Sequence, residues 1–301
     1  MRIGTPEHRD LFCRTFIETH TAFEPELLPW PELSDVELAR LRAFPFWSYA
    51  RSIEQRAGRM VTGFAQKVAD PVIREAVALQ GFEETRHGRL MAHVIERYGI
   101  EVPENPMEDA PLHNDDFCIF GFGECSDSFV GFGAFSLVRQ KGLFPEPLLA
   151  IFDEVLFEEA RHVVFFINWW RYEEARAGRD KPVLRTFAAL RYHLRAIVGA
   201  ATGAADSPKA DIRLDDPELD AFVKSVTPLM FLEAALAENR RMMARLDRKL
   251  VKPTLMPGIA TALLLGIRML PPRRDVVAAP TPSRNGAGAV TAPVSAGNPA
   301  T

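Results

Sequence analysis

The chain alternates between segments in which apolar residues recur every three or four positions and short segments rich in proline and glycine. Apolar residues with this period form one face of an α-helix. Almost no segment shows the strict polar–apolar alternation of a β-strand, so the pattern predicts an all-α protein. The predicted helices cover residues 46–68, 71–99, 116–141, 145–178, a stretch opening at Pro182, and 219–250.

Residues that cap or break helices mark the predicted boundaries. Ser34 followed by Glu37 predicts a capping box that opens a short helix ending near Pro45. Asp70 followed by Pro71 suits an N-cap and a first helical position. These signals place the start of a helix immediately before two of the predicted apolar stretches.

The chain divides into four regions. Residues 1–33 are predicted to form an irregular arm with one short helix, and residues 34–250 an all-α domain with a four-helix core and accessory helices. Residues 251–272 are predicted to form an apolar C-terminal helix. Residues 273–301 hold few bulky apolar side chains and are expected to be a disordered tail.

The strongly apolar stretch 255–270 is flanked by arginines and lysines. At ~1.5 Å rise per residue it reaches ~24 Å, which is short of a hydrocarbon core of about 30 Å. Two interpretations stay open: a helix packed on the bundle, or a peripheral contact with a membrane or partner. A transmembrane span fits less well than either.

Composition restricts the class of protein further. A net charge of −4 without a long basic stripe gives no basis for nucleic-acid binding. The three cysteines lack disulfide or metal-site spacing, and the N-terminal residues lack the apolar core of a secretion signal. We therefore expect a cytoplasmic protein, with membrane association left open by the 255–270 stretch.

Two short motifs carry the candidate chemistry. Residues 83–87 and 158–162 both read Glu-Glu-x-Arg-His, which places a carboxylate and an imidazole three residues apart on one helix face. Another glutamate precedes each motif by about one helix and a turn. Four helices would thus deliver the six ligands of a dimetal-carboxylate site: Glu54, Glu84, His87, Glu124, Glu159 and His162.

Without metal, four carboxylates in a bundle core would repel one another and lose hydration, whereas two divalent ions would balance their charge. Oxygen-rich ligation with one imidazole per ion suits iron or manganese better than structural zinc. We expect two iron ions, with a manganese–iron pair as the alternative. The predicted sets are Glu54, Glu84 and His87 for one ion and Glu124, Glu159 and His162 for the other, with Glu84 and Glu159 bridging.

The first glutamate and the arginine of each motif have predicted supporting roles. A ligating imidazole needs an acceptor for its second ring N–H. Glu83 and Glu158 are expected to accept this bond from the histidine of the opposite motif, and Arg86 and Arg161 to neutralise them.

At these residues the chain resembles the ferritin-like dimetal-carboxylate superfamily, over roughly residues 45–175. The motif is closest to the oxygen-activating branch, which includes desaturases, multicomponent monooxygenases and the ribonucleotide reductase small subunit. The resemblance implies a non-haem diiron enzyme that activates O2 to hydroxylate or desaturate a hydrophobic or acyl substrate. It also implies an external electron donor, a ferredoxin or a reductase, and leaves a homodimer open.

Three positions bear on which members of this superfamily the chain can resemble in function. The radical tyrosine of the reductases is replaced by Met91, and an extra ligand histidine of the arylamine oxygenases is replaced by Val155. His193 could substitute for the latter, although a hydrogen-bonded core or surface histidine is the simpler interpretation. Two other functions stay open: iron handling as a ferroxidase, and a non-catalytic bundle stabilised by metal.

The stretch 116–141 has an unusual composition. Its glycines predict either close helix packing or room for a substrate beside the metals, and its phenylalanines would give such a space apolar walls. Asp127 and Ser128 follow Glu124 by about one turn and are candidates for proton delivery. The glycines are Gly121, Gly123, Gly131 and Gly133, and the phenylalanines are Phe117, Phe120, Phe122, Phe129, Phe132 and Phe135.

Overall fold

The computed structural model describes residues 1–44, 46–102, 115–206 and 216–269. These residues form helices and connecting segments and contain no strand, so the all-α prediction is confirmed for them. The helices are α1 (Pro6–Glu18), the 3₁₀ helix η1 (Pro25–Leu27), α2 (Asp35–Ala43), α3 (Trp47–Ala65), α4 (Pro71–Arg97), α5 (Asp116–Lys141), α6 (Glu146–Arg176), α7 (Pro182–Asp206), α8 (Pro217–Ser225), α9 (Pro228–Ala244) and α10 (Leu255–Met269).

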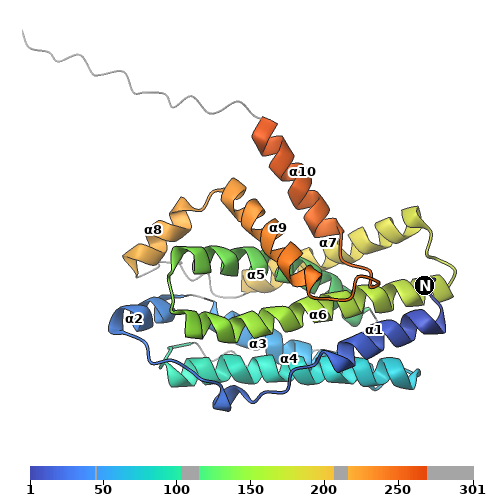
Figure 1. The fold of residues 1–301 in the computed structure, drawn as a ribbon, viewed down its shortest axis with the longest axis horizontal. Helices are drawn as coiled ribbons and strands as arrows, with labels where there is room; N and C mark the ends of the chain where they lie inside the picture. Colours follow the sequence, from blue (N-terminus) through green and yellow to red (C-terminus); the bar gives the residue numbers. More distant parts are fainter. Residues whose placement is uncertain (45, 103–114, 207–215, 270–301) are drawn as a thin grey trace, which may run out of the picture.

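Four long helices, α3 to α6, form the centre of the molecule (Figure 1). The helix pair α3–α4 faces the pair α5–α6, and α1 packs across α4 and α6. On the other side, α7 and α9 pack against α5, and α10 packs against α9. All six predicted ligands therefore lie on the four central helices, α3 to α6.

Glycines allow α3 and α4 to approach closely. A Cβ on Gly58 would clash with Thr85, and a Cβ on Gly81 would clash with Thr62. The side chain that each glycine lacks is replaced by the neighbouring helix backbone. This contact holds α3 close to the helix that carries the first motif.

The predicted helix starts agree with the structure. Ser34 and Glu37 form both hydrogen bonds of the capping box at α2. The Asp70 carboxylate accepts from the N–H groups of Val72 and Ile73 at the start of α4. Local capping chemistry therefore fixes these boundaries, as the sequence suggested.

Most of the stretch 219–250, which was predicted to be helical, is helical in the structure, but it is interrupted and the helical part ends at Ala244. Two helices, α8 and α9, occupy this stretch. Thr227 caps the second through the N–H of Met230, and Pro228 has no N–H to continue the first. Near the N-terminus, α1 packs against the bundle, whereas the predicted tail 273–301 lies outside the described residues.

The apolar helix α10 has two different sides. Ala260 and Leu264 are buried with α9 and α5 residues, whereas Ile259, Leu263 and Leu265 are exposed. Among the described residues, no helix combines the length and the apolarity needed to cross a membrane.

Candidate metal centre

The six predicted ligands converge between the four central helices. α3 positions Glu54, α5 positions Glu124, and the two motifs on α4 and α6 supply the remaining four. Each motif occupies one helix face because its glutamate and histidine are three residues apart. The site is buried: Glu84, His87 and His162 are almost completely inaccessible to water.

The donor atoms form two groups with two shared members. One group contains Glu54, Glu84, His87 and Glu159, and the other contains Glu84, Glu124, Glu159 and His162. In each group the donor atoms lie within 4.8 Å of one another. Glu84 and Glu159 belong to both, which is the arrangement that two bridging carboxylates require.

Glu83 and Glu158 meet the histidines of the opposite motifs, as predicted. His162 Nε2 lies 2.8 Å from Glu83 Oε2, and His87 Nε2 lies 2.9 Å from Glu158 Oε2. These bonds fix each imidazole with its Nδ1 directed at the cluster. An imidazole held in this way is pre-oriented as a metal ligand.

Two buried arginines balance these carboxylates. Arg86 donates to Glu158, and Arg161 donates to Glu83 over 2.8 Å. Both arginines are also bound by the N-terminal segment: Arg161 donates to the Phe16 carbonyl, and Arg86 donates to the Thr21 carbonyl. The segment predicted as an irregular arm therefore closes one side of the centre.

The charge balance of the cluster itself is unfavourable. Burial, together with Glu159 and Glu84, raises the pKa of Glu54 to about 7 despite its contact with His87. Burial and the same two carboxylates raise the pKa of Glu124 well above its usual range. Burial also acts on Glu159, but the two imidazoles outweigh it and lower its pKa to about 2. The four carboxylates thus outnumber the two imidazoles that could neutralise them.

Two buried ring nitrogens test whether the cluster fits metal ions. Nδ1 of His87 and Nδ1 of His162 are buried without a hydrogen-bond partner. They lie 3.0 Å from Glu159 Oε1 and 2.9 Å from Glu84 Oε1, but without hydrogen-bond geometry. Imidazole and carboxylate lone pairs that converge on common points are the donor set of a divalent cation. The residues therefore fit a pair of metal ions.

Two residues of the site had not been predicted. Gln80 is buried one turn before Glu84, and its amide donates to Glu84 and, at 3.5 Å, to Glu124. The four-residue spacing on α4 could have revealed it. His20 lies with Nδ1 2.6 Å from Glu83 Oε1, and no local sequence signal relates it to a residue so distant in the chain.

A third set of donors, His20, Glu83 and Glu158, also comes within 4.8 Å. Arg161 lies within ion-pair distance of both carboxylates, and Arg86 also pairs with Glu158. Positive charge is already present at this set, so it fits a cation less well than the first two groups do.

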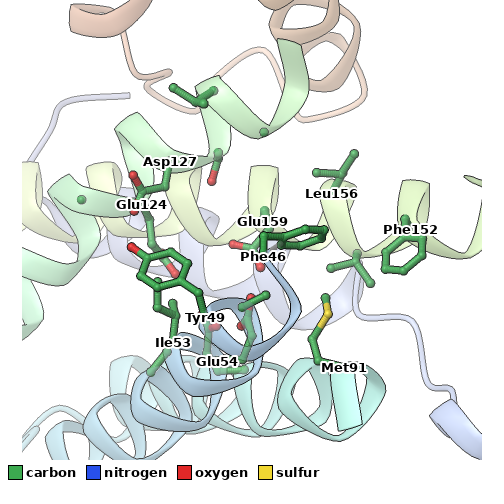
Figure 2. A pocket seen from close by; sticks show the side chains of 18 of the residues that line it. Phe46, Tyr49, Ile53, Glu54, Met91, Glu124, Asp127, Phe152, Leu156 and Glu159 are labelled. Carbon is green, nitrogen blue, oxygen red and sulfur yellow. The ribbon is translucent and has the colours of Figure 1, made fainter. Parts of the chain in front are cut away.

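A cavity of about 1270 Å³ opens beside the cluster (Figure 2). Four of its lining residues are the carboxylates Glu54, Glu84, Glu124 and Glu159. Most of the rest is apolar and comes from α3, α5 and α6, with Met91 from α4; the apolar lining includes Phe46, Ile53, Phe152, Val155 and Leu156. Such a space is suited to a hydrophobic ligand.

The prediction that the phenylalanines of α5 would wall such a space is only partly correct. Of the six phenylalanines, Phe120 and Phe135 line it. The other four, Phe117, Phe122, Phe129 and Phe132, are buried in the hydrophobic core instead. These four lie on the other faces of α5. A helix with apolar residues around most of its circumference packs against neighbours on several sides.

The four glycines of α5 also fall into two groups, one at the cavity and one packed against neighbouring helices. Gly123 and Gly131 line the cavity. A Cβ on Gly121 would meet the Phe166 ring, and a Cβ on Gly133 would meet Ala235 at 2.8 Å. Both interpretations of these glycines therefore apply, each to a different face.

The two candidates for proton delivery, Asp127 and Ser128, lie on the cavity wall. Asp127 is accessible to water, but the concave surroundings desolvate it and, with Glu159, raise the pKa of its carboxyl. His193 does not reach the cluster. It is buried against Phe122, with Nδ1 3.2 Å from Ser126 Oγ, and is thus a core histidine.

Comparisons with protein-family models, with curated proteins and with solved structures found no match to this chain. The residues of the site itself are therefore the basis for inferring function.

Proposed function

We propose that this protein is a ferritin-like four-helix bundle enzyme. It would use a non-haem dimetal-carboxylate centre to activate O2 and oxidise a hydrophobic organic substrate. One observation carries the proposal: two groups of buried Glu and His donors share two carboxylates and border a large apolar cavity. A centre that only stabilises the fold does not require such a space beside its ligands.

Glu54, Glu84 and His87 would hold one ion and Glu124, Glu159 and His162 the other, with Glu84 and Glu159 bridging. When bound, two iron ions, or a manganese–iron pair, would supply the redox chemistry with O2, with electrons from a ferredoxin or a reductase.

The residues of the chain would serve this chemistry in three ways. Glu83 and Glu158 fix the tautomer and direction of the ligand imidazoles. Asp127, with a raised pKa, can hold a proton on the cavity wall at neutral pH more readily than an ordinary aspartate. The apolar part of the lining would position a hydrocarbon group beside the cluster.

The first test is metal content per chain after anaerobic loading with Fe²⁺, followed by the optical spectrum on adding O2. Wild type would be compared with Glu84→Ala and Glu159→Ala. The matched controls are Glu75→Ala and Glu154→Ala, which remove exposed glutamates from the same two helices.

We expect two irons per chain and a transient visible absorption in wild type and controls, both lost in the ligand variants. Less than one metal per chain, unchanged in the ligand variants, would refute the dimetal centre. Two irons with no optical response to O2 would favour a structural metal site instead. Rapid iron oxidation followed by accumulation of ferric iron beyond two per chain would favour iron handling.

A further inference from the structure

The outer face of α7 is apolar and exposed. Large hydrophobic side chains recur on it every three or four residues, and each keeps more than half of its surface exposed. They are Val183, Leu184, Phe187, Leu190, Leu194, Ile197 and Val198. A helix of a water-exposed domain normally carries polar residues on this side, so the face needs a covering phase or partner.

The opposite face of α7 accounts for its position in the fold. Tyr192 stacks on Phe122 with ring centroids 5.7 Å apart, and His193 packs on the same ring. Arg195 pairs with Asp115 just before α5. The helix is therefore anchored on α5, with its apolar stripe directed away from the bundle.

Charge on α7 differs from that of the whole chain. The protein has a net charge of −4, but residues 181–199 include four cations and no acidic residue. The exposed Arg191 lies within the apolar face itself. Two of these cations are in ion pairs, Arg185 with Asp180 and Arg195 with Asp115. An apolar helix face that carries an exposed arginine matches an anionic lipid surface.

The cavity reaches this helix. Ala196 and Gly199 of α7 belong to the cavity lining, together with Tyr49, Ile53 and Arg56 of α3. Tyr49 and Ile53 are themselves exposed apolar side chains. The cavity therefore borders the side of α7 that faces α5, and the exposed apolar side chains of α3 lie at its rim.

We infer that α7 docks this protein on the surface of a bilayer containing anionic lipids, and that the cavity takes an acyl chain from that bilayer. The helix would lie in the interface plane with its apolar face in the acyl boundary and Arg191 at the headgroups. The acyl-substrate part rests on the proposed function, whereas the docking part does not.

The test is flotation of the full chain with vesicles of phosphatidylcholine alone or of two parts phosphatidylcholine and one part phosphatidylglycerol. Phe187→Glu and Leu194→Glu place a charge in the α7 face. Leu27→Glu is the matched control, because Leu27 is an exposed apolar residue on η1. Leu263→Glu makes the same change on the exposed side of α10.

We expect wild type to bind the anionic vesicles more tightly than the neutral ones and to dissociate at high salt. Each α7 substitution should weaken partitioning at least about tenfold, while Leu27→Glu and Leu263→Glu should not. Thermal unfolding and light scattering accompany each variant. An unchanged melting temperature and molar mass would support the docking interpretation.

Three results would overturn it. The first is no binding to anionic vesicles, or loss of binding in Leu263→Glu alone. The second is a lower melting temperature of the α7 variants, which would mean that the face is packed within the protein. The third is a smaller assembly, which would identify a second copy as the partner. Vesicle binding is also measured with Glu84→Ala, so that failure of the metal centre and failure of docking are distinguished.

Discussion

Replacement of Glu158 by glutamine tests the link between the supporting carboxylates and the metals. The carboxylate oxygen Oε2 lies 2.9 Å from His87 Nε2, and Arg86 donates to the other oxygen. Glutamine keeps one acceptor oxygen but removes the charge that orients the imidazole and strengthens its donor atom. Loss of such a partner weakens metal binding about 10–100-fold, or about 1.4–2.8 kcal/mol.

The same change affects stability, because Arg86 and Glu158 are both buried. Breaking a buried pair by removing one partner costs about 3–5 kcal/mol. Arg86 keeps the Thr21 carbonyl and the Phe23 ring, so we expect the lower part of this range. The double variant Glu158→Gln/Arg86→Met removes the unpaired charge and should recover stability without recovering metal affinity.

The assay is competition for Co²⁺ between the protein and a chromophoric chelator, combined with urea unfolding of the metal-free protein. Glu158→Gln should weaken one of two binding steps, and Glu83→Gln should weaken the step that depends on His162. Glu154→Gln, an exposed change on the same helix, should leave both steps unaltered. Unchanged affinities in both buried variants would refute the supporting role.

Three further predictions concern acidity, packing and the cavity. Burial favours protonated Glu83, but His162 and Arg161 outweigh it and hold the pKa of this carboxyl well below its usual range. The stability that ionised Glu83 contributes is complete above its unfolded pKa of about 4.3 and is lost as the pH falls toward the folded value. The free energy of unfolding, measured with urea on metal-free protein, should therefore fall below about pH 4–5, and less steeply in Glu83→Gln. Gly58→Ala should lower the free energy of unfolding by ~1–2 kcal/mol, because the clash with Thr85 costs more than the gain in helix propensity. The control is Gly266→Ala, because Gly266 has open space around it. A Gly58→Ala protein that is more stable than wild type would contradict this prediction. Gly131→Phe should fill part of the cavity and reduce binding of a fluorescent fatty acid without changing metal content, and equal binding would show that the ligand lies elsewhere.

Much of the fold and the convergence of the six candidate residues could be predicted because the signals are local. Helix period, the capping box at Ser34 and the Asp70–Pro71 start depend on residues within one or two turns of one another. The repeated motif predicts which carboxylates and imidazoles come together because two residues three apart on a helix share a face. The contacts of Glu83 and Glu158 with the opposite histidines followed from the same repetition.

The errors arise where the outcome depends on distant residues. The aromatic residues of α5 were all expected at the cavity, but Phe122 packs against α6 and α7 and Phe129 packs near α9. The composition of one helix does not say which neighbour each face will meet. The break at Pro228 was available locally, but the apolar pattern on both sides obscured it.

The anchoring of Arg161 has a consequence for the order of assembly. Its guanidinium binds the Phe16 carbonyl and the Thr19 hydroxyl, which are 145 and 142 positions earlier in the chain. During synthesis α1 is complete long before α6 emerges, so the two can join only after most of the bundle has been made. Contacts of such sequence separation form slowly, because a long loop must close first. Maturation of the centre would then be one of the last folding events, and a bulky fusion at the N-terminus should delay metal uptake more than one at the C-terminus.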